Sequence, residues 1–374
     1  MKISYISNSV IPSRAANSIH VMKVCQSFSD LGHDVTLLAP DKNEDYEKDV
    51  INIYEYYGVK NIFTVCKVSW FKKIKGKSYI YGLFAAIRTI FLGSDLVYAR
   101  HLYGAFFASL FGRKVIFESH APIASGSQVD LWLFKTMISR KSFANLVVIT
   151  FALKEYYLHN YPQLIDRIIV APDGADPIDE KIEAFDFSND KERLQVGYVG
   201  HLYPGRGLEI IIKLAELCDW ADFHVIGGTE SDIDYWKNNS KICNITFHGF
   251  VTPVVAERMR LACDVLLAPY QNSVAVSGGG GNTVQWMSPL KIFEYMAAGK
   301  VIISSDLPVL HEVLVDNKNA LLCKATNADD WAQKLTTIRD NPSQAKVIAQ
   351  QGLQDFTSRY SWNSRVKTIL NAIG

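Results

Sequence analysis

The feature that most constrains the fold of this chain is an alternation of short apolar segments with longer amphipathic ones, in two separate runs. The first run opens with a strand pattern at 2–7, a helix pattern at 18–31 closed by Gly32, and a second strand pattern at 34–39. Such a unit implies parallel strands joined by a crossover helix. Its repetition predicts an α/β fold in which helices cover parallel sheets.

A turn-rich stretch separates the two runs. Residues 171–177 read Ala-Pro-Asp-Gly-Ala-Asp-Pro, a charged segment follows at 179–193, and the strand and helix patterns then resume. The chain has 374 residues, more than one hydrophobic core usually organises. We therefore predict two Rossmann-like, doubly wound domains at 1–170 and 171–357. If the domains face one another, their strand ends would place the ligand site in the cleft between them.

A helix pattern in the second half begins at Ser288 and ends at Gly299. Ser288 is a favoured N-cap, Pro289 suits the first helical position, and Gly299 can adopt the left-handed conformation that ends a helix. Lys291 would lie in the first turn, where the helix dipole disfavours a cation unless an anion binds there. Glu294 shares a face with Lys291 and could reach the ribose of a nucleotide. A surface ion pair between the two would explain the pattern without a ligand.

A second phosphate-binding pattern is the loop 200–207, which directly follows a strand and opens a helix. Its glycines would let the backbone approach a ligand closely, and Arg206 could bind two phosphate oxygens at once. His201 could add a charge or a hydrogen bond. A structural turn that merely tolerates glycine is the alternative.

The first half offers weaker candidates. His120 ends a strand pattern and would project into the same cleft, where a polar group can orient a sugar, although a structural role is the alternative. Asn17, Ser18 and His20 lie at the start of the first helix pattern and could contact a ligand. Their positions as N-caps would explain them equally well.

Composition excludes some classes of function. A formal net charge of +1 argues against nucleic-acid binding through bulk charge. Residues 60–92 contain no acidic residue, and their basic and aromatic residues alternate, which suits either an anionic membrane surface or a solvated face beside a core helix. No apolar run is long enough to span a bilayer, and the six cysteines lack paired spacing. We expect a cytoplasmic chain with reduced thiols.

In order and spacing, the segments 171–176, 200–207, 247–250 and 288–308 resemble the retaining glycosyltransferases of the family 4 type. The resemblance extends along nearly the whole chain. It implies the GT-B fold, with an acceptor-side first domain, a nucleotide-sugar-binding second domain, and a final helix, about 358–374, that crosses back to the first. It also implies a UDP- or GDP-sugar donor, no cofactor and no catalytic metal.

The resemblance assigns roles to single residues. Arg206 matches the basic residue that neutralises the donor diphosphate, and His201 stands where the family usually has Arg. Glu294 matches the glutamate that holds the ribose, and His120 matches the histidine that touches the donor sugar. Further donor contacts implied in this way, at the helix start and beside the base, are Ser288, Leu290, Lys291, Gly249 and Phe250.

The sequence departs from the family pattern at three places. The first glutamate of the family's pair falls at Trp286, so sugar contacts would be arranged differently, using the loop 278–283 with Asn282 and Thr283. The usual glycine pair after the first strand is replaced by residues around Asn17 and Ser18. His201 in place of Arg weakens the fixed charge at the phosphates.

We expect a hexosyl transfer with retention, from a nucleotide diphosphate sugar to a hydroxyl of a glycan or lipid-linked acceptor, in bacterial surface-polysaccharide assembly. Arg206, Lys291 and helix amides would stabilise the leaving diphosphate, which itself takes the acceptor proton. One alternative is a GT-B epimerase with acid and base groups around the sugar. Another is a Rossmann-type dinucleotide-binding protein with Asp41 on the ribose, although the chain lacks a compact Gly-x-Gly-x-x-Gly turn.

Overall fold

The structure is a computed structural model that describes residues 1–123, 126–187, 192–239, 242–275 and 282–373. It divides into two compact units. Unit 1 comprises Met1–Pro172 and Trp362–Gly374, and unit 2 comprises Asp173–Ser361. The predicted boundaries were 170 and about 358, two to four residues before the observed ones.

Unit 1 is built on a seven-stranded sheet in the order β3-β2-β1-β4-β5-β6-β7, in which every pairing is parallel. Its strands are β1 Lys2–Ile6, β2 Asp34–Pro40, β3 Thr64–Val68, β4 Leu96–Ala99, β5 Val115–Ser119, β6 Phe143–Val148 and β7 Ile168–Val170. Its helices are α1 Ala16–Asp30, α2 Ile53–Tyr56, α3 Lys77–Phe91, α4 Leu102–Leu110, α5 Gln128–Ile138, α6 Phe151–Asn160 and α13 Trp362–Asn371, with 3₁₀ turns at Asn43–Asp45 and Pro162–Arg167.

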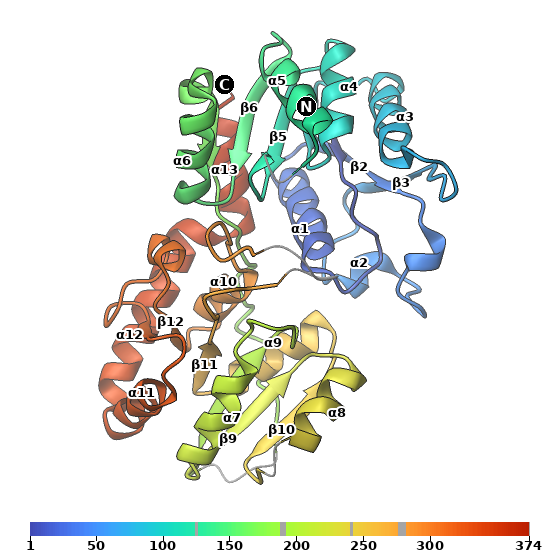
Figure 1. The fold of residues 1–374 in the computed structure, drawn as a ribbon. Helices are drawn as coiled ribbons and strands as arrows, with labels where there is room; N and C mark the ends of the chain where they lie inside the picture. Colours follow the sequence, from blue (N-terminus) through green and yellow to red (C-terminus); the bar gives the residue numbers. More distant parts are fainter. Residues whose placement is uncertain (124–125, 188–191, 240–241, 276–281, 374) are drawn as a thin grey trace. The chain divides into compact units, whose positions relative to one another are not determined.

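The strand order of unit 1 reverses between β1 and β4, so the right-handed crossovers through α1 and α4 lie on opposite faces of the sheet. Helices α3, α4 and α5 pack against one another in succession, and α1 packs against α13. Helix α13 is the last of the chain and returns to unit 1 (Figure 1).

Unit 2 is built on a six-stranded parallel sheet in the order β10-β9-β8-β11-β12-β13. Its strands are β8 Leu194–Val199, β9 Ala221–Ile226, β10 Ile245–Gly249, β11 Val265–Ala268, β12 Val301–Ser305 and β13 Leu321–Cys323. Its helices are α7 Leu208–Leu217, α8 Glu230–Asn239, α9 Pro253–Ala262, α10 Leu290–Ala297, α11 Ala328–Asp340 and α12 Pro342–Asp355, with a 3₁₀ turn at Pro308–Glu312 and a π-helical turn at Phe356–Tyr360.

The sheet of unit 2 is apolar on both faces. Val265 and Leu267 of β11 belong to one buried cluster, and Leu266 and Ala268 of the same strand belong to another. Since successive side chains of a strand point to opposite faces, helices must cover both sides of the sheet. Both sheets being parallel, the predicted α/β class with two Rossmann-like units is confirmed.

Two smaller expectations concern the cysteines and the membrane. The six cysteines form no disulfide, as their scattered spacing predicted. Among the residues that the structure describes, no helix is both long and apolar enough to cross a membrane.

Candidate active site

The candidate site of unit 2 lies at the carboxyl ends of β8 and β11, which are neighbours in the sheet. A Cβ atom on Gly200 would lie 2.8 Å from Nζ of Lys291, so the lysine rests directly against the backbone of this loop. Cβ atoms on Gly205 and Gly207 would instead approach the carbonyl oxygens of Ser273 and Pro269 to 2.0 and 1.9 Å. These two glycines therefore let the loops after β8 and β11 pack together, and only Gly200 faces the lysine.

Lys291 is a buried lysine on α10. Its Nζ has no hydrogen-bond partner among the described residues and lies 3.8 Å from the ring centre of Tyr198 and 5.3 Å from that of Tyr270. Burial lowers the pKa of Lys291 far below its ordinary value, and the charge of Arg206 lowers it further, against the opposing effect of Glu294. An ammonium without a partner is costly to bury, and a bound anion would relieve that cost.

Arg206 and His201 complete the basic group around Lys291. The guanidinium carbon of Arg206 lies 5.6 Å from the ring centre of Tyr270, and its Nε finds no partner among the described residues. Burial lowers the pKa of His201, and the charges of Arg206 and Lys291 lower it further. His201 is therefore neutral at pH 7, and the fixed positive charge comes from Arg206.

Glu294 forms an ion pair with Arg260, which is not among the predicted site residues. Its Oε2 lies 3.3 Å from the guanidinium of Arg260, on α9, whose side chain is buried. The side chain of Glu294 remains 29% exposed. The alternative of a surface ion pair between Lys291 and Glu294 is wrong, because the lysine has no hydrogen-bond partner. Arg260 holds the carboxylate, and its exposed side is left to face a ligand.

The start of α10 differs from the prediction. The helix begins at Leu290, with Pro289 in the extended N-cap position and no side-chain cap. The predicted N-cap role of Ser288 is wrong, because its hydroxyl oxygen accepts a hydrogen bond from the amide of Asp173 at 2.9 Å. Gly299 has the predicted left-handed conformation, with φ 62°. The amide of Ile292 donates to the carbonyl of Pro289 at 3.1 Å, so in the first turn of α10 the amides of Leu290 and Lys291 can donate to an anion.

The predicted sugar contacts have local hydrogen bonds of their own. Asn282 Oδ1 accepts from the amide of Val274, and the hydroxyl of Thr283 donates to the carbonyl of Val274. The amide of Trp286 donates to the carbonyl of Thr283. The rest of the predicted glycine loop, residues 276–281, lies outside the described residues. Asn282 and Thr283 therefore have a structural role in fastening the loop that follows β11.

The predicted base-binding residues lie at the end of β10. Gly249 has φ 71°, and its carbonyl accepts from the amide of Gly227 at 2.7 Å. Phe250, which follows, has 40% of its surface exposed. The end of the strand thus presents a glycine backbone and an exposed ring, and the contact of this segment with the base stays a prediction.

In unit 1 the candidate site centres on Glu118, near the end of β5. Its fully buried Oε1 lies 2.5 Å from Nε2 of His120 and 2.9 Å from Nε2 of His20. Arg365 of α13 donates to the same oxygen at 2.8 Å, and the hydroxyl of Tyr98 donates to Oε2. Burial raises the pKa of Glu118, but Arg365, His20 and the hydrogen bonds of both histidines outweigh it and hold the pKa well below its ordinary value.

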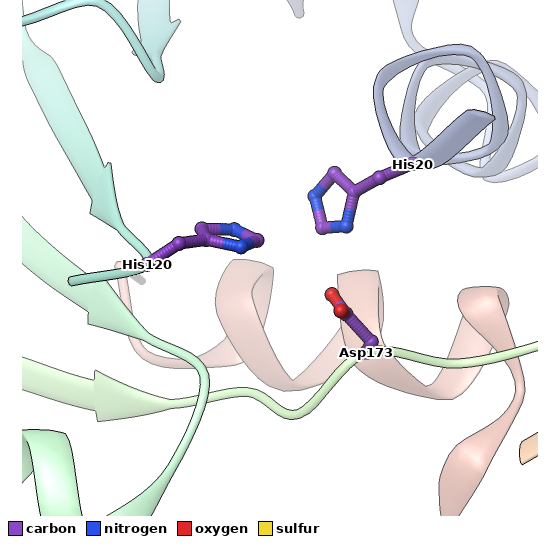
Figure 2. A group of neighbouring side chains, drawn as sticks. All are labelled: His20, His120 and Asp173. Carbon is purple, nitrogen blue, oxygen red and sulfur yellow. The ribbon is translucent and has the colours of Figure 1, made fainter. Parts of the chain in front are cut away.

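Figure 2 shows the rings of His20, from α1, and His120, after β5, close together. Their centroids are 5.0 Å apart at an interplanar angle of 82°, and the ring of Trp362 meets His20 edge to face at 5.2 Å. Asp173, also labelled there, is the first residue of unit 2. The predicted residues His20 and His120 are thus brought together, through a carboxylate that the sequence analysis passed over.

The other two candidates of the first helix are not part of this cluster. Helix α1 begins at Ala16 with Ala15 as its N-cap, so the alternative explanation of Asn17, Ser18 and His20 as N-caps is wrong. Asn17 and Ser18 lie inside the first turn of the helix. The hydroxyl of Ser18 donates to the carbonyl of Ala15 at 2.7 Å, and Asn17 is exposed.

Both halves of the chain match models of glycosyltransferase families. Residues 18–178 match the family described as Glycosyltransferase Family 4, and residues 193–341 match the family described as Glycosyl transferases group 1. An uncharacterized glycosyltransferase of Methanocaldococcus jannaschii, MJ1069, is 23% identical over 96% of this chain and 94% of its own.

Two solved structures resemble the whole chain. Sucrose-phosphate synthase from Thermosynechococcus elongatus has a TM-score of 0.73 at 14% identity, covering 99% of this chain and 97% of its own. Anabaena HepE in complex with UDP has a TM-score of 0.70 at 14% identity, with all of both chains covered.

Proposed function

The chain belongs to the glycosyltransferases of the family 4 type and has the GT-B fold, and we propose that it transfers a hexosyl group from a nucleoside diphosphate sugar with retention of configuration. The observation that carries the donor assignment is Lys291. Its buried amino group has no hydrogen-bond partner among the described residues, and it lies on a helix whose first turn has no side-chain cap. A diphosphate supplies the negative charge that both features lack.

In the proposed reaction, the bond from the anomeric carbon to the diphosphate oxygen breaks as the bond to the acceptor oxygen forms on the same face. Negative charge develops on the leaving diphosphate, and Arg206, Lys291 and the first-turn amides of α10 stabilise it. The leaving phosphate oxygen takes the proton of the acceptor hydroxyl. The two side-chain cations supply the charge that a metal ion would otherwise provide, so we propose a reaction without metal or cofactor.

The remaining donor contacts follow from the same geometry. Glu294, oriented by Arg260, would accept hydrogen bonds from the ribose hydroxyls. Gly249 and Phe250 would meet the base, and the UDP bound to the Anabaena relative supports uridine as the first candidate. The role of His120 as the contact to the donor sugar comes from the family resemblance.

We propose a glycan or lipid-linked acceptor, used at the cytoplasmic face of a membrane in polysaccharide assembly. Support comes from the basic segment 60–92. Phe71 and Phe84 in this segment are both exposed, and their ring centroids lie 6.0 Å apart. Lys73 and Lys75, in the loop before α3, are exposed as well. Aromatic rings among lysines favour an anionic lipid surface.

Donor binding tests this function directly. We expect UDP- or GDP-sugars to raise the melting temperature of the protein, since a ligand at 100 times its Kd stabilises by about 2.7 kcal/mol. Incubation with acceptors should then yield a glycoside with the anomeric configuration of the donor, in the presence of a chelator. Isomerised donor without transfer would favour the epimerase instead. Stabilisation by a nicotinamide dinucleotide alone would favour the Rossmann-type dinucleotide-binding protein.

Arg260→Leu should weaken donor binding by about tenfold, because the carboxylate of Glu294 loses the cation that orients it. The change should appear in the Kd of the nucleotide, measured by calorimetry. Arg258→Leu, on the same helix, is the matched control, since its Nε donates to the carbonyl of Glu183. In a Glu294→Gln background, Arg260→Leu should have little further effect. Equal losses in both backgrounds would show that Arg260 does not act through Glu294.

A further inference from the structure

The carboxylate of Glu118 is shared by four side chains from four different elements of unit 1. Tyr98 comes from β4, His20 from α1 and Arg365 from α13, and His120 follows β5. The side chains of Glu118, His20 and Arg365 are almost completely buried, whereas His120 is 24% exposed. The only partly accessible member of the cluster is therefore the histidine to which the family resemblance assigns the sugar contact.

The contact with Glu118 constrains which ring nitrogen of His120 carries a proton. An ionised carboxylate can only accept, so Nε2 of His120, 2.5 Å from Oε1 of Glu118, carries the proton that it donates. A neutral imidazole that donates from Nε2 carries its acceptor lone pair on Nδ1. Glu118 thereby selects the tautomer of His120 as well as the orientation of its ring.

Arg365 is itself held in place by the backbone. Its Nε donates to the carbonyl of Pro172 at 3.0 Å, while its NH2 group donates to Glu118. One turn earlier on α13, Trp362 packs edge to face on His20, whose ring packs on that of His120. Helix α13 is thus connected to His120 in two ways, through the ion pair of Arg365 with Glu118 and through the ring of Trp362 on His20.

We propose that Glu118 is a positioning residue that fixes the ring and the Nε2–H tautomer of His120, and that Arg365 of the last helix keeps this carboxylate ionised for that purpose. The inference rests on the proposed function only for the contact between His120 and the donor sugar. The fixed tautomer itself is a property of the free protein. It therefore has a test that requires no turnover.

The test is histidine-selective ¹⁵N NMR of the full chain without ligand, with a His120→Asn variant to assign the His120 signal among nine histidines. We expect a single Nε2–H tautomer in the native protein. Glu118→Gln should convert it to a mixture of both tautomers. Because Glu118→Gln leaves Arg365 buried without its counter-charge, a Glu118→Gln/Arg365→Gln variant, which removes both charges, is measured as well. The control is Asp222→Asn, which removes an ion pair with Arg193 in unit 2.

A His120 spectrum unchanged in whichever of the two variants folds would overturn the proposal, and so would the Nδ1–H tautomer in the native protein. Turnover gives a second readout. Glu118→Gln should lower kcat by about 10- to 100-fold and leave the KM for the donor nearly unchanged, as for other partners that orient a functional histidine. If the tautomer responds as expected but no sugar transfer is found with any donor, the proposed function fails and the positioning role stands.

Discussion

Lys291→Met is expected to lower kcat/KM for sugar transfer by about 10²- to 10³-fold, the size of effect found when one transition-state donor is removed. The same substitution should raise the melting temperature of the unliganded protein. Methionine has a similar length, and it removes an amino group that is buried against Tyr198 and Tyr270 without a hydrogen-bond partner in the described chain. Activity and stability should therefore change in opposite directions.

Steady-state kinetics and differential scanning calorimetry measure the two effects on one preparation. Lys213→Met is the matched control, because Lys213 is an exposed lysine on α7, outside the site. We expect this control to change neither quantity. If Lys291→Met destabilised the protein and retained its activity, the lysine would be a structural residue and the diphosphate site would lie elsewhere.

Arg365→Met is expected to destabilise the protein by about 3 to 5 kcal/mol, because it leaves the carboxylate of Glu118 buried without its counter-charge. The cost should depend on pH. Since the pKa of Glu118 is lower in the folded state than its ordinary 4.5, ionisation stabilises the fold above that value, and the stabilisation is lost as the pH falls toward the folded pKa. Without Arg365 the folded pKa of Glu118 rises, so the variant loses less stability on acidification, and its deficit relative to the native protein should shrink as the pH falls.

Urea unfolding between pH 3 and pH 8 would measure both the loss and its pH dependence. Arg14→Met in the same unit is the control, since its ion pair with Glu47 is partly exposed and should contribute less than about 1 kcal/mol. Equal losses of stability from the two substitutions at pH 7 would mean that the buried ion pair stabilises the fold no more than the exposed one. A pH profile parallel to that of the native protein would contradict the assignment to Glu118.

The elements of this fold were predictable because each carries its own local signal. Alternation of apolar strands with amphipathic helices is periodic in the sequence, and the turn-rich stretch at 171–177 interrupts it between the units. The end of α10 at Gly299 was predicted as well, since a left-handed residue has a strong preference for glycine. The start of α10 was not predicted correctly, because the hydroxyl of Ser288 accepts a hydrogen bond from the amide of Asp173, which lies 115 residues earlier.

The candidate site was predictable on the same terms. Arg206, Lys291 and Glu294 each follow a strand or open a helix, so their positions at one edge of a sheet follow from local pattern and fold class. The ion-pair partners of these residues do not follow from local pattern. Arg260 lies 34 residues from Glu294, and nothing in its own helix marks it as a partner. A signal existed for Glu118, which is an acidic residue within an apolar strand pattern and therefore needs a buried partner.

The sequence by itself determined the fold class, the two-unit organisation and the strand-end residues, because these depend on interactions between near neighbours along the chain. Only the tertiary structure decided which charges pair. It joined Glu294 to Arg260, left Lys291 without a hydrogen-bond partner in the described chain, and brought Arg365 to Glu118 across 247 residues. Ion pairing depends on distance and burial in space, and a linear pattern encodes neither quantity.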